Sequence, residues 1–137
     1  MIVHMMLCDH AQVADGKLFI HGGGISRVQG TGLPPGASIA VLVLVPWERT
    51  NQPIALQLDL LTEDGQLVAD QNGQTRSIAA ELEVGRPPGV EPGVPIDVPM
   101  AWPVGGVFLR PGRYTWRLTI DGQTAQAWQV SFSVVPS

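Results

Sequence analysis

Turn-forming residues interrupt this 137-residue chain so often that only short elements can form. The chain has 16 glycines and 12 prolines, and they recur at intervals of roughly 8 to 12 residues, as they do in sandwiches and barrels. The intervals are rich in β-branched residues and alternate in polarity, which is typical of strands. We therefore expect an all-β fold with almost no helix.

The clearest strand pattern lies at residues 113–120. Alternate side chains there are apolar, so one face should be buried: Tyr114, Trp116, Leu118 and Ile120. Residues 126–134 repeat the pattern, and we expect the two strands to form a hairpin at Asp121-Gly122. A two-residue turn would place Gln129 on the core face. We therefore expect a loop with an odd number of residues, or a bulge, that puts Trp116 and Trp128 on the same buried side.

The other elements complete the predicted sandwich. Further strands are expected at residues 2–8, 17–22, 38–45, 53–61, 66–69, 77–84 and 96–102. Segment 38–45 is apolar on both faces, so it should be central in a sheet or part of an oligomer interface. Segment 85–95 carries prolines that lack N–H donors, which indicates an extended loop of polyproline character, either a rigid connector or a peptide displayed to a partner.

A tyrosine-corner spacing suggests the type of sandwich. Gly112 precedes Tyr114 at the start of a strand, where a tyrosine hydroxyl can reach back to an upstream main-chain group. Trp116 stands where immunoglobulin domains place their second cysteine. The sequence therefore predicts a single domain over residues 1–137, an immunoglobulin-like antiparallel β-sandwich of about 7–9 strands.

Composition narrows the possible partners. The chain has 8 basic and 12 acidic residues and a net charge of −4, which argues against nucleic acid or anionic lipid. Its longest apolar run is far shorter than a membrane-spanning helix, and its first residues lack the basic segment of a signal peptide. The single cysteine, Cys8, fits a reducing, cytoplasmic compartment. With 45% hydrophobic and 15% charged residues, we expect a partner to cover some apolar surface, most simply in a homo-oligomer.

The stretch His21-Gly22-Gly23-Gly24 is the nearest approach to a catalytic motif. In α/β-hydrolases an HGGG loop supplies N–H groups to the oxyanion, beside a Gly-x-Ser-x-Gly elbow and a βαβ framework. This chain has neither of those features. We expect the glycines to bend one strand into residues 25–29, and we expect no catalytic residue, no cofactor and no enzyme activity.

Two groups of residues could bind a ligand. If Asp15-Gly16 closes a two-residue hairpin, His10 falls opposite His21 with Cβ atoms about 5 Å apart, and Cys8 lies one same-face step away, which is the minimum for zinc. Alternatively residues 11–14 form an irregular loop, and no fourth ligand is evident, so our preferred interpretation has no metal site. Trp47 and Trp102 are the candidate ligand-binding residues.

These tryptophans and a set of arginines each have two interpretations. Trp47 lies just past a strand end, where an exposed aromatic can form a sugar-binding platform or cover the open end of the sandwich. Arg113 and Arg117, with Arg110 nearby, form a basic stripe that is a solvated face or a site for an acidic partner.

The opening Leu7-Cys8-Asp9-x-Ala11-x-Val13-x-x-Gly16-Lys17-Leu18-x-Ile20-x-Gly22 resembles the start of a bacterial family of functionally uncharacterised proteins of about this length. Asp64-Gly65 and Leu109-x-Pro111-Gly112-x-Tyr114 fit the same pattern. The resemblance implies a β-sandwich but does not imply any particular activity, and His10 and His21 are not part of the pattern.

Three functional hypotheses follow from the sequence. The first is a non-enzymatic protein-interaction or structural module, self-associating as a homodimer or a subunit of a larger assembly. The second is a sandwich that binds a carbohydrate or another small molecule near Trp47 or Trp102. The third is a small zinc protein that uses Cys8, His10 and His21.

Overall fold

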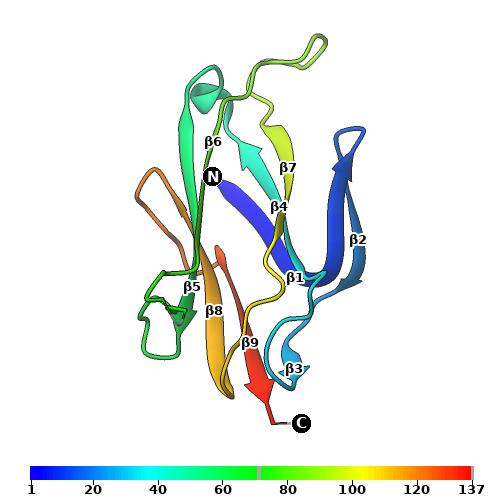
Figure 1. Cartoon of the computed structure of the whole chain (residues 1–137). Coiled ribbons are helices and arrows are strands. Elements are labelled where there is room, and N and C mark those ends of the chain that lie inside the picture. The colour runs from blue at the N-terminus through cyan, green and yellow to red at the C-terminus, as the bar shows by residue number, and fades with distance from the viewer. Residues whose placement is uncertain (71, 137) are drawn as a thin grey trace.

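The computed structural model describes residues 1–70 and 72–136 and shows two packed β-sheets (Figure 1). Within these residues the chain forms nine strands and one short 3₁₀ helix: β1 (Ile2–Ala14), β2 (Lys17–Gly23), β3 (Arg27–Gln29), β4 (Ser38–Val45), η1 (Trp47–Arg49), β5 (Ile54–Thr62), β6 (Ser77–Leu82), β7 (Ile96–Pro103), β8 (Gly112–Ile120) and β9 (Gln129–Val135). The predicted all-β sandwich is confirmed. Its assignment to the immunoglobulin-like type stays a prediction.

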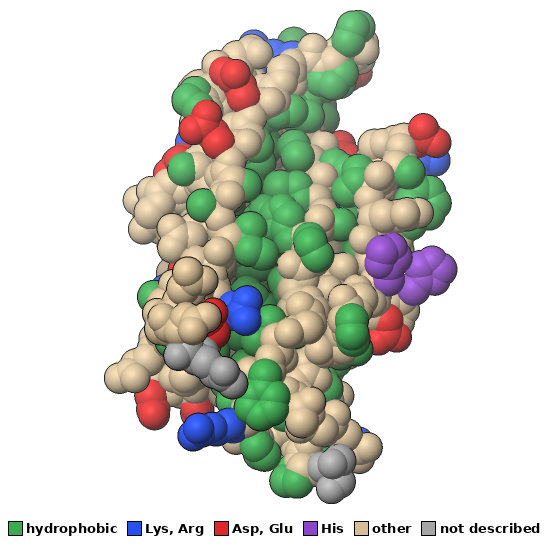
Figure 2. Space-filling model, viewed as in Figure 1, with side chains coloured by type: hydrophobic (Ala, Val, Ile, Leu, Met, Phe, Trp, Pro, Cys, Tyr) green, Lys and Arg blue, Asp and Glu red, His purple; other side chains and the backbone are tan. Residues whose placement is uncertain are grey.

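Four strands form one sheet, in the order β2-β1-β4-β7, and five form the other, in the order β3-β9-β8-β5-β6. Neighbouring strands are antiparallel, except that β3 runs parallel to β9. Strand β4 is central in its sheet, as its apolar faces predict. The sheets do not close into a barrel, and hydrophobic side chains are visible along the gap between them (Figure 2).

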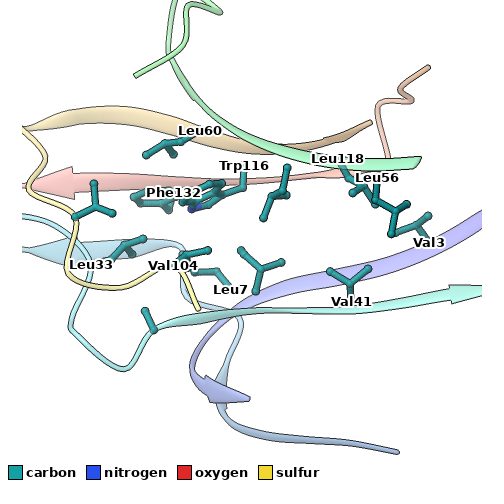
Figure 3. Packing of buried hydrophobic residues seen from close by; sticks show 14 of the residues in the cluster. Val3, Leu7, Leu33, Val41, Leu56, Leu60, Val104, Trp116, Leu118 and Phe132 are labelled. Atoms are coloured by element: carbon teal, nitrogen blue, oxygen red, sulfur yellow. The ribbon is translucent and has the colours of Figure 1, made fainter. Parts of the chain in front are cut away.

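The core lies between the sheets and takes alternate side chains from both (Figure 3). Trp116 is 2% exposed and Phe132 is fully buried, and they lie opposite Leu7 of the other sheet. The ring of Tyr114 stacks on Phe132 with their centroids 5.8 Å apart. Alternation on β8 therefore builds the interior that the sequence indicates.

The β8–β9 hairpin has the predicted register. Trp116 pairs with Val130, and the N–H of Leu118 donates to the carbonyl of Trp128 at 2.8 Å. This pairing leaves an odd number of residues in the connection, so Trp128 packs against the same core as Trp116, although it is only half-buried. Strand β9 begins at Gln129 and not at residue 126, because the preceding residues form turns.

The amino-terminal hairpin is longer than the sequence predicts. Strand β1 does not end at residue 8 but continues to Ala14 and pairs with β2. Asp15 (φ 52°) and Gly16 (φ 69°) close it as a two-residue turn, and this left-handed pair matches the twist of a hairpin. Residues 11–14 are therefore strand and not an irregular loop.

Two further expectations are wrong, one about a strand at residues 66–69 and one about the loop at residues 85–95. Segment 66–69 forms only isolated bridges, Leu61 with Leu67 and Ala69 with Thr75, because tight turns on both sides leave it no regular ladder. Segment 85–95 is not an extended polyproline loop. It contains two successive turns, in which Val90 and Val94 donate to carbonyls three residues upstream, because each turn has proline followed by a glycine with positive φ.

Candidate functional site

The hairpin brings His10 and His21 together, but Cys8 does not join them. The two histidines pair directly across β1 and β2, with ring centroids 6.5 Å apart. Cys8 is fully buried in a small cluster with Ala11 and Ala40, and its Sγ donates to the Ser38 carbonyl at 3.3 Å. Residues 1–70 and 72–136 contain no group of three or more histidine, cysteine or acidic side chains that could hold a metal ion.

The Cys8 thiol has a second property that follows from this location. Burial raises its pKa, an effect that the nearby charge of Asp9 reinforces and that backbone hydrogen bonds partly oppose. A raised pKa disfavours the thiolate, which is the form that attacks disulfides and binds metals. Cys8 is therefore placed as a small core residue of the hairpin.

The HGGG stretch is a corner of the chain. The N–H groups of Gly24 and Ile25 both donate to the carbonyl of Leu7 at 2.9 Å, so they are engaged by the backbone. Gly22 has a φ of 61°, and a Cβ there would lie 2.1 Å from Oδ2 of Asp9. Glycine is required where the chain turns, as the sequence predicts.

Trp47 is covered on one face by an arginine. The guanidinium carbon of Arg86 lies 3.7 Å from the centroid of the Trp47 ring, a cation–π contact. Nε of Arg86 donates to Oγ1 of Thr50 at 2.8 Å, and Nη2 donates to the Trp47 carbonyl at 3.0 Å. Together they fix the end of the sandwich, so this ring face does not offer an open platform for a sugar.

Trp102 lies far from Trp47 and cannot share a site with it. It is half-buried on β7 and pairs with Ile39 near the start of β4, whereas Trp47 follows the end of β4. The length of β4 separates them by about 20 Å. The two tryptophans therefore lie near opposite ends of β4, each in its own surroundings.

The predicted basic stripe lies on the outer face of the five-stranded sheet. Nη1 of Arg113 donates to Ser133 at 3.4 Å, and Arg117 pairs across the sheet with Asp59. The Asp59 side chain is buried and accepts hydrogen bonds from Ser77 and Gln57. The hydroxyl of Tyr114 donates to the carbonyl of Arg110 at 2.8 Å, as the corner spacing predicts.

A pocket that sequence reasoning missed lies between the segment before β6 and the loop between β7 and β8. Its volume is about 590 Å³, and its lining includes Leu67, Val68, Arg76, Phe108, Arg110 and Tyr114. Phe108 is 67% exposed and Leu67 is 45% exposed. Among residues 1–70 and 72–136, the buried Nε of Arg76 has no hydrogen-bond partner. No spacing in the sequence joins segments about forty residues apart, so no signal in the sequence indicates this pocket.

A second feature is the apolar outer surface of the four-stranded sheet, which we call the outer face. By strand alternation it is formed by side chains of β1, β4 and β7: Ile2, His4, Met6, Ala40, Leu42, Leu44, Asp97, Pro99 and Ala101. The chain itself already covers Ala40, which is 2% exposed and packs with Cys8 and Ala11. Ile2 is 57% exposed and Met6 is 40% exposed. Solvated faces of antiparallel sheets are normally polar, so this face has the composition of a covered one.

Comparison with known proteins identifies the family alone. The model of a family of unknown function (DUF6941) matches residues 3–134, and the chain belongs to this family. A search of the curated proteins found no match. In the part of the chain that the structure describes, no helix is long and apolar enough to cross a membrane.

Proposed function

We propose that this member of a family of unknown function is a non-enzymatic interaction module, and that it associates with a second copy of itself through the outer face. The observation that carries the proposal is the apolar centre of that face. Leu42 and Leu44 point away from the core on the central strand and stay half-exposed. A central strand that is apolar on both sides needs cover on both sides.

The total exposed area supports a covering partner. The chain exposes 7931 Å², whereas a compact monomer of its mass, 14.6 kDa, exposes about 6,900 Å². The difference of about 1,000 Å² is close to the roughly 800 Å² that each partner buries in an interface of standard size. Burial of this area would bring the chain to the surface expected of a compact protein.

The charge of the outer face supports a second copy as the partner. Among its nine positions only His4 and Asp97 are titratable, and both are exposed on flanking strands. A face with few charges can meet its own copy across a two-fold axis without like-charge repulsion at the centre. The hairpin beside the sheet also exposes hydrophobic residues, Phe19 and Ile20, one on each of its faces.

A cytoplasmic location forms part of the proposal. Cys8 is a free, buried thiol that is used for packing, which supports a reducing compartment. The engaged N–H groups of Gly24 and Ile25 support a role without catalysis by the HGGG stretch.

Sedimentation velocity at micromolar concentration tests the proposal. We expect the wild-type protein to sediment at twice the monomer mass, and Leu42→Lys to sediment as a monomer because it places a charge at the centre of the buried face. Thr119→Lys is the matched control, since Thr119 is also half-buried and outward on a central strand, but of the other sheet. A monomeric wild type, or a Leu42→Lys variant that stays dimeric, would contradict the proposal.

A further inference from the structure

The sandwich is open along one side, between β6 and β7. Each of these strands ends its sheet, and in residues 1–70 and 72–136 they do not pair with each other. Their inward side chains pack against the core but are only half-buried: Ile78, Ala80, Leu82, Val98, Met100 and Trp102. We call these six residues the open side. Figure 2 shows hydrophobic side chains in such a gap between the sheets.

The free edge of β7 is a poor acceptor for another strand. Pro99 pairs with Leu42 of β4, and because proline has no N–H, this position must direct its missing donor away from β4. Pro103 lies four residues later, in the same alternation. Two donors are therefore missing from this edge, a usual protection against strand addition.

The free edge of β6 has no such protection. The N–H of Leu60 donates to the carbonyl of Arg76, so the main-chain groups at alternate positions from Arg76 face β5. Those of Ser77, Ala79 and Glu81 then face the free edge, and none of these residues is proline. A strand added here would lie about 4.8 Å from β6 and could cover the open side.

The charges along β6 set the direction of such a strand. At one end, Arg76 and Arg110 line the pocket of about 590 Å³, and toward the other end lie Glu81 and Glu83. Asp70 also lines the pocket, but its Oδ1 already accepts hydrogen bonds from two nearby main-chain N–H groups. An antiparallel peptide would bring its carboxyl end to the arginines and its amino end to the glutamates.

We propose that the open side binds an extended segment of a protein partner. The segment pairs antiparallel with β6, places apolar side chains at alternate positions against the open side, and ends with its carboxylate in the pocket beside Arg76. Strand addition and capture of a terminal carboxylate are both known modes of peptide recognition. The Arg76 guanidinium, which lines the pocket, gives this carboxylate a charged donor.

The test uses an acetylated heptapeptide of alternating threonine and valine, with an amino-terminal lysine and a free carboxyl end, and the same peptide with a carboxamide end. Binding is followed by amide NMR and hydrogen exchange. We expect the acid to protect the amides of Ser77, Ala79 and Glu81 at least tenfold and to bind at least tenfold more tightly than the carboxamide. Arg76→Met should remove that preference.

Edge pairing is tested with Ala79→Pro, which removes one N–H from the free edge, and with Ala79→Thr as the control that keeps it. We expect only the proline variant to lose peptide binding. If that variant does not fold, N-methylation of alternate peptide residues replaces it, and one alternate set should abolish binding while the other preserves it.

Three results would overturn the proposal. The first is binding that is indifferent to Ala79→Pro or to both sets of N-methyl groups, and the second is equal binding of acid and carboxamide. The third is self-association that Ala79→Pro abolishes and Ala79→Thr preserves, because the occupant would then be a second copy. The outer-face interface is tested separately, by sedimentation of the Leu42→Lys variant, and a negative result there does not affect these peptide-binding results.

Discussion

Gly105 lies where the connection after β7 passes against the loop before β4, and no side chain fits there. A Cβ at Gly105 would lie 2.2 Å from the carbonyl oxygen of Pro34 and 2.6 Å from that of Pro35. Both obstacles are backbone atoms, so no rotation of a side chain can relieve the overlap. In the variant Gly105→Ala the two segments must separate.

The cost of that separation follows from what joins the segments. The N–H of Val104 donates to the Ala37 carbonyl at 2.9 Å, and the N–H of Gly106 donates to the Leu33 carbonyl at 3.3 Å. Each bond contributes about 1 kcal/mol net. Leu33 and Val104 are also buried, and a fully buried aliphatic side chain contributes about 1.5–3 kcal/mol, part of which is lost. We expect Gly105→Ala to lower the free energy of unfolding by about 3–5 kcal/mol.

The neighbouring glycine provides the control. Gly106 has a φ of +75°, and no atom lies within 4 Å of the position that a Cβ would take there, so Gly106→Ala should cost only the left-handed conformation, about 1–2 kcal/mol. Equilibrium urea unfolding, followed by tryptophan fluorescence, measures both variants. If Gly105→Ala lowers the free energy of unfolding no more than Gly106→Ala does, the two segments do not approach each other as closely as the structure indicates.

Three other predictions concern single side chains. Tyr114→Phe removes the hydroxyl that donates to an upstream carbonyl and should lower the free energy of unfolding by about 1 kcal/mol in urea; no change would show that the bond contributes nothing. The pKa of Asp121 is lowered, first by the hydrogen bond from the N–H of Ala55 and then by Arg49, so its stabilisation is present above the ordinary value of 3.8 and is lost as the pH falls through the lower folded-state value. The difference in stability between wild type and Asp121→Asn should therefore shrink in acid, and a difference that does not vary with pH would refute this. Because burial raises the pKa of the Cys8 thiol, Ellman's reagent should label it only when urea unfolds the chain, and rapid labelling of the native protein would contradict its placement.

Local alternation predicted the features that depend on neighbours in sequence. It placed Trp116 and Trp128 on one side, and it required an odd connection between their strands, which the pairing of Trp116 with Val130 confirms. It also indicated the bend at the HGGG stretch, because glycines without a βαβ context have few other uses. These inferences needed only the two-residue period of a strand and the chemistry of turns.

Contacts between distant segments were beyond the reach of that reasoning. Arg86 covers Trp47 from a loop 39 residues away, and no pattern in either segment indicates the pair. The pocket beside Arg76 has the same origin, since Phe108 reaches it from another loop. Cys8 does not join the candidate metal ligands His10 and His21, for a local reason that the alternation of apolar residues cannot show. Cys8 and Ala11 are buried in one cluster, whereas His10 between them is exposed, so the alternation of burial breaks between Cys8 and Ala11.

The alternation of apolar residues predicts that a face of a strand is buried, but it does not predict what covers that face. Strands β6 and β8 carry the same pattern of apolar side chains, yet Leu118 of β8 is fully buried, while Ile78 and Leu82 of β6 stay half-buried. The difference lies in the order of the strands, because β8 is central and β6 is at an edge. Where the pattern predicts burial and the fold does not supply it, we propose that another molecule provides the cover. The outer face and the open side both meet that condition, and this is why we propose both of them as binding surfaces.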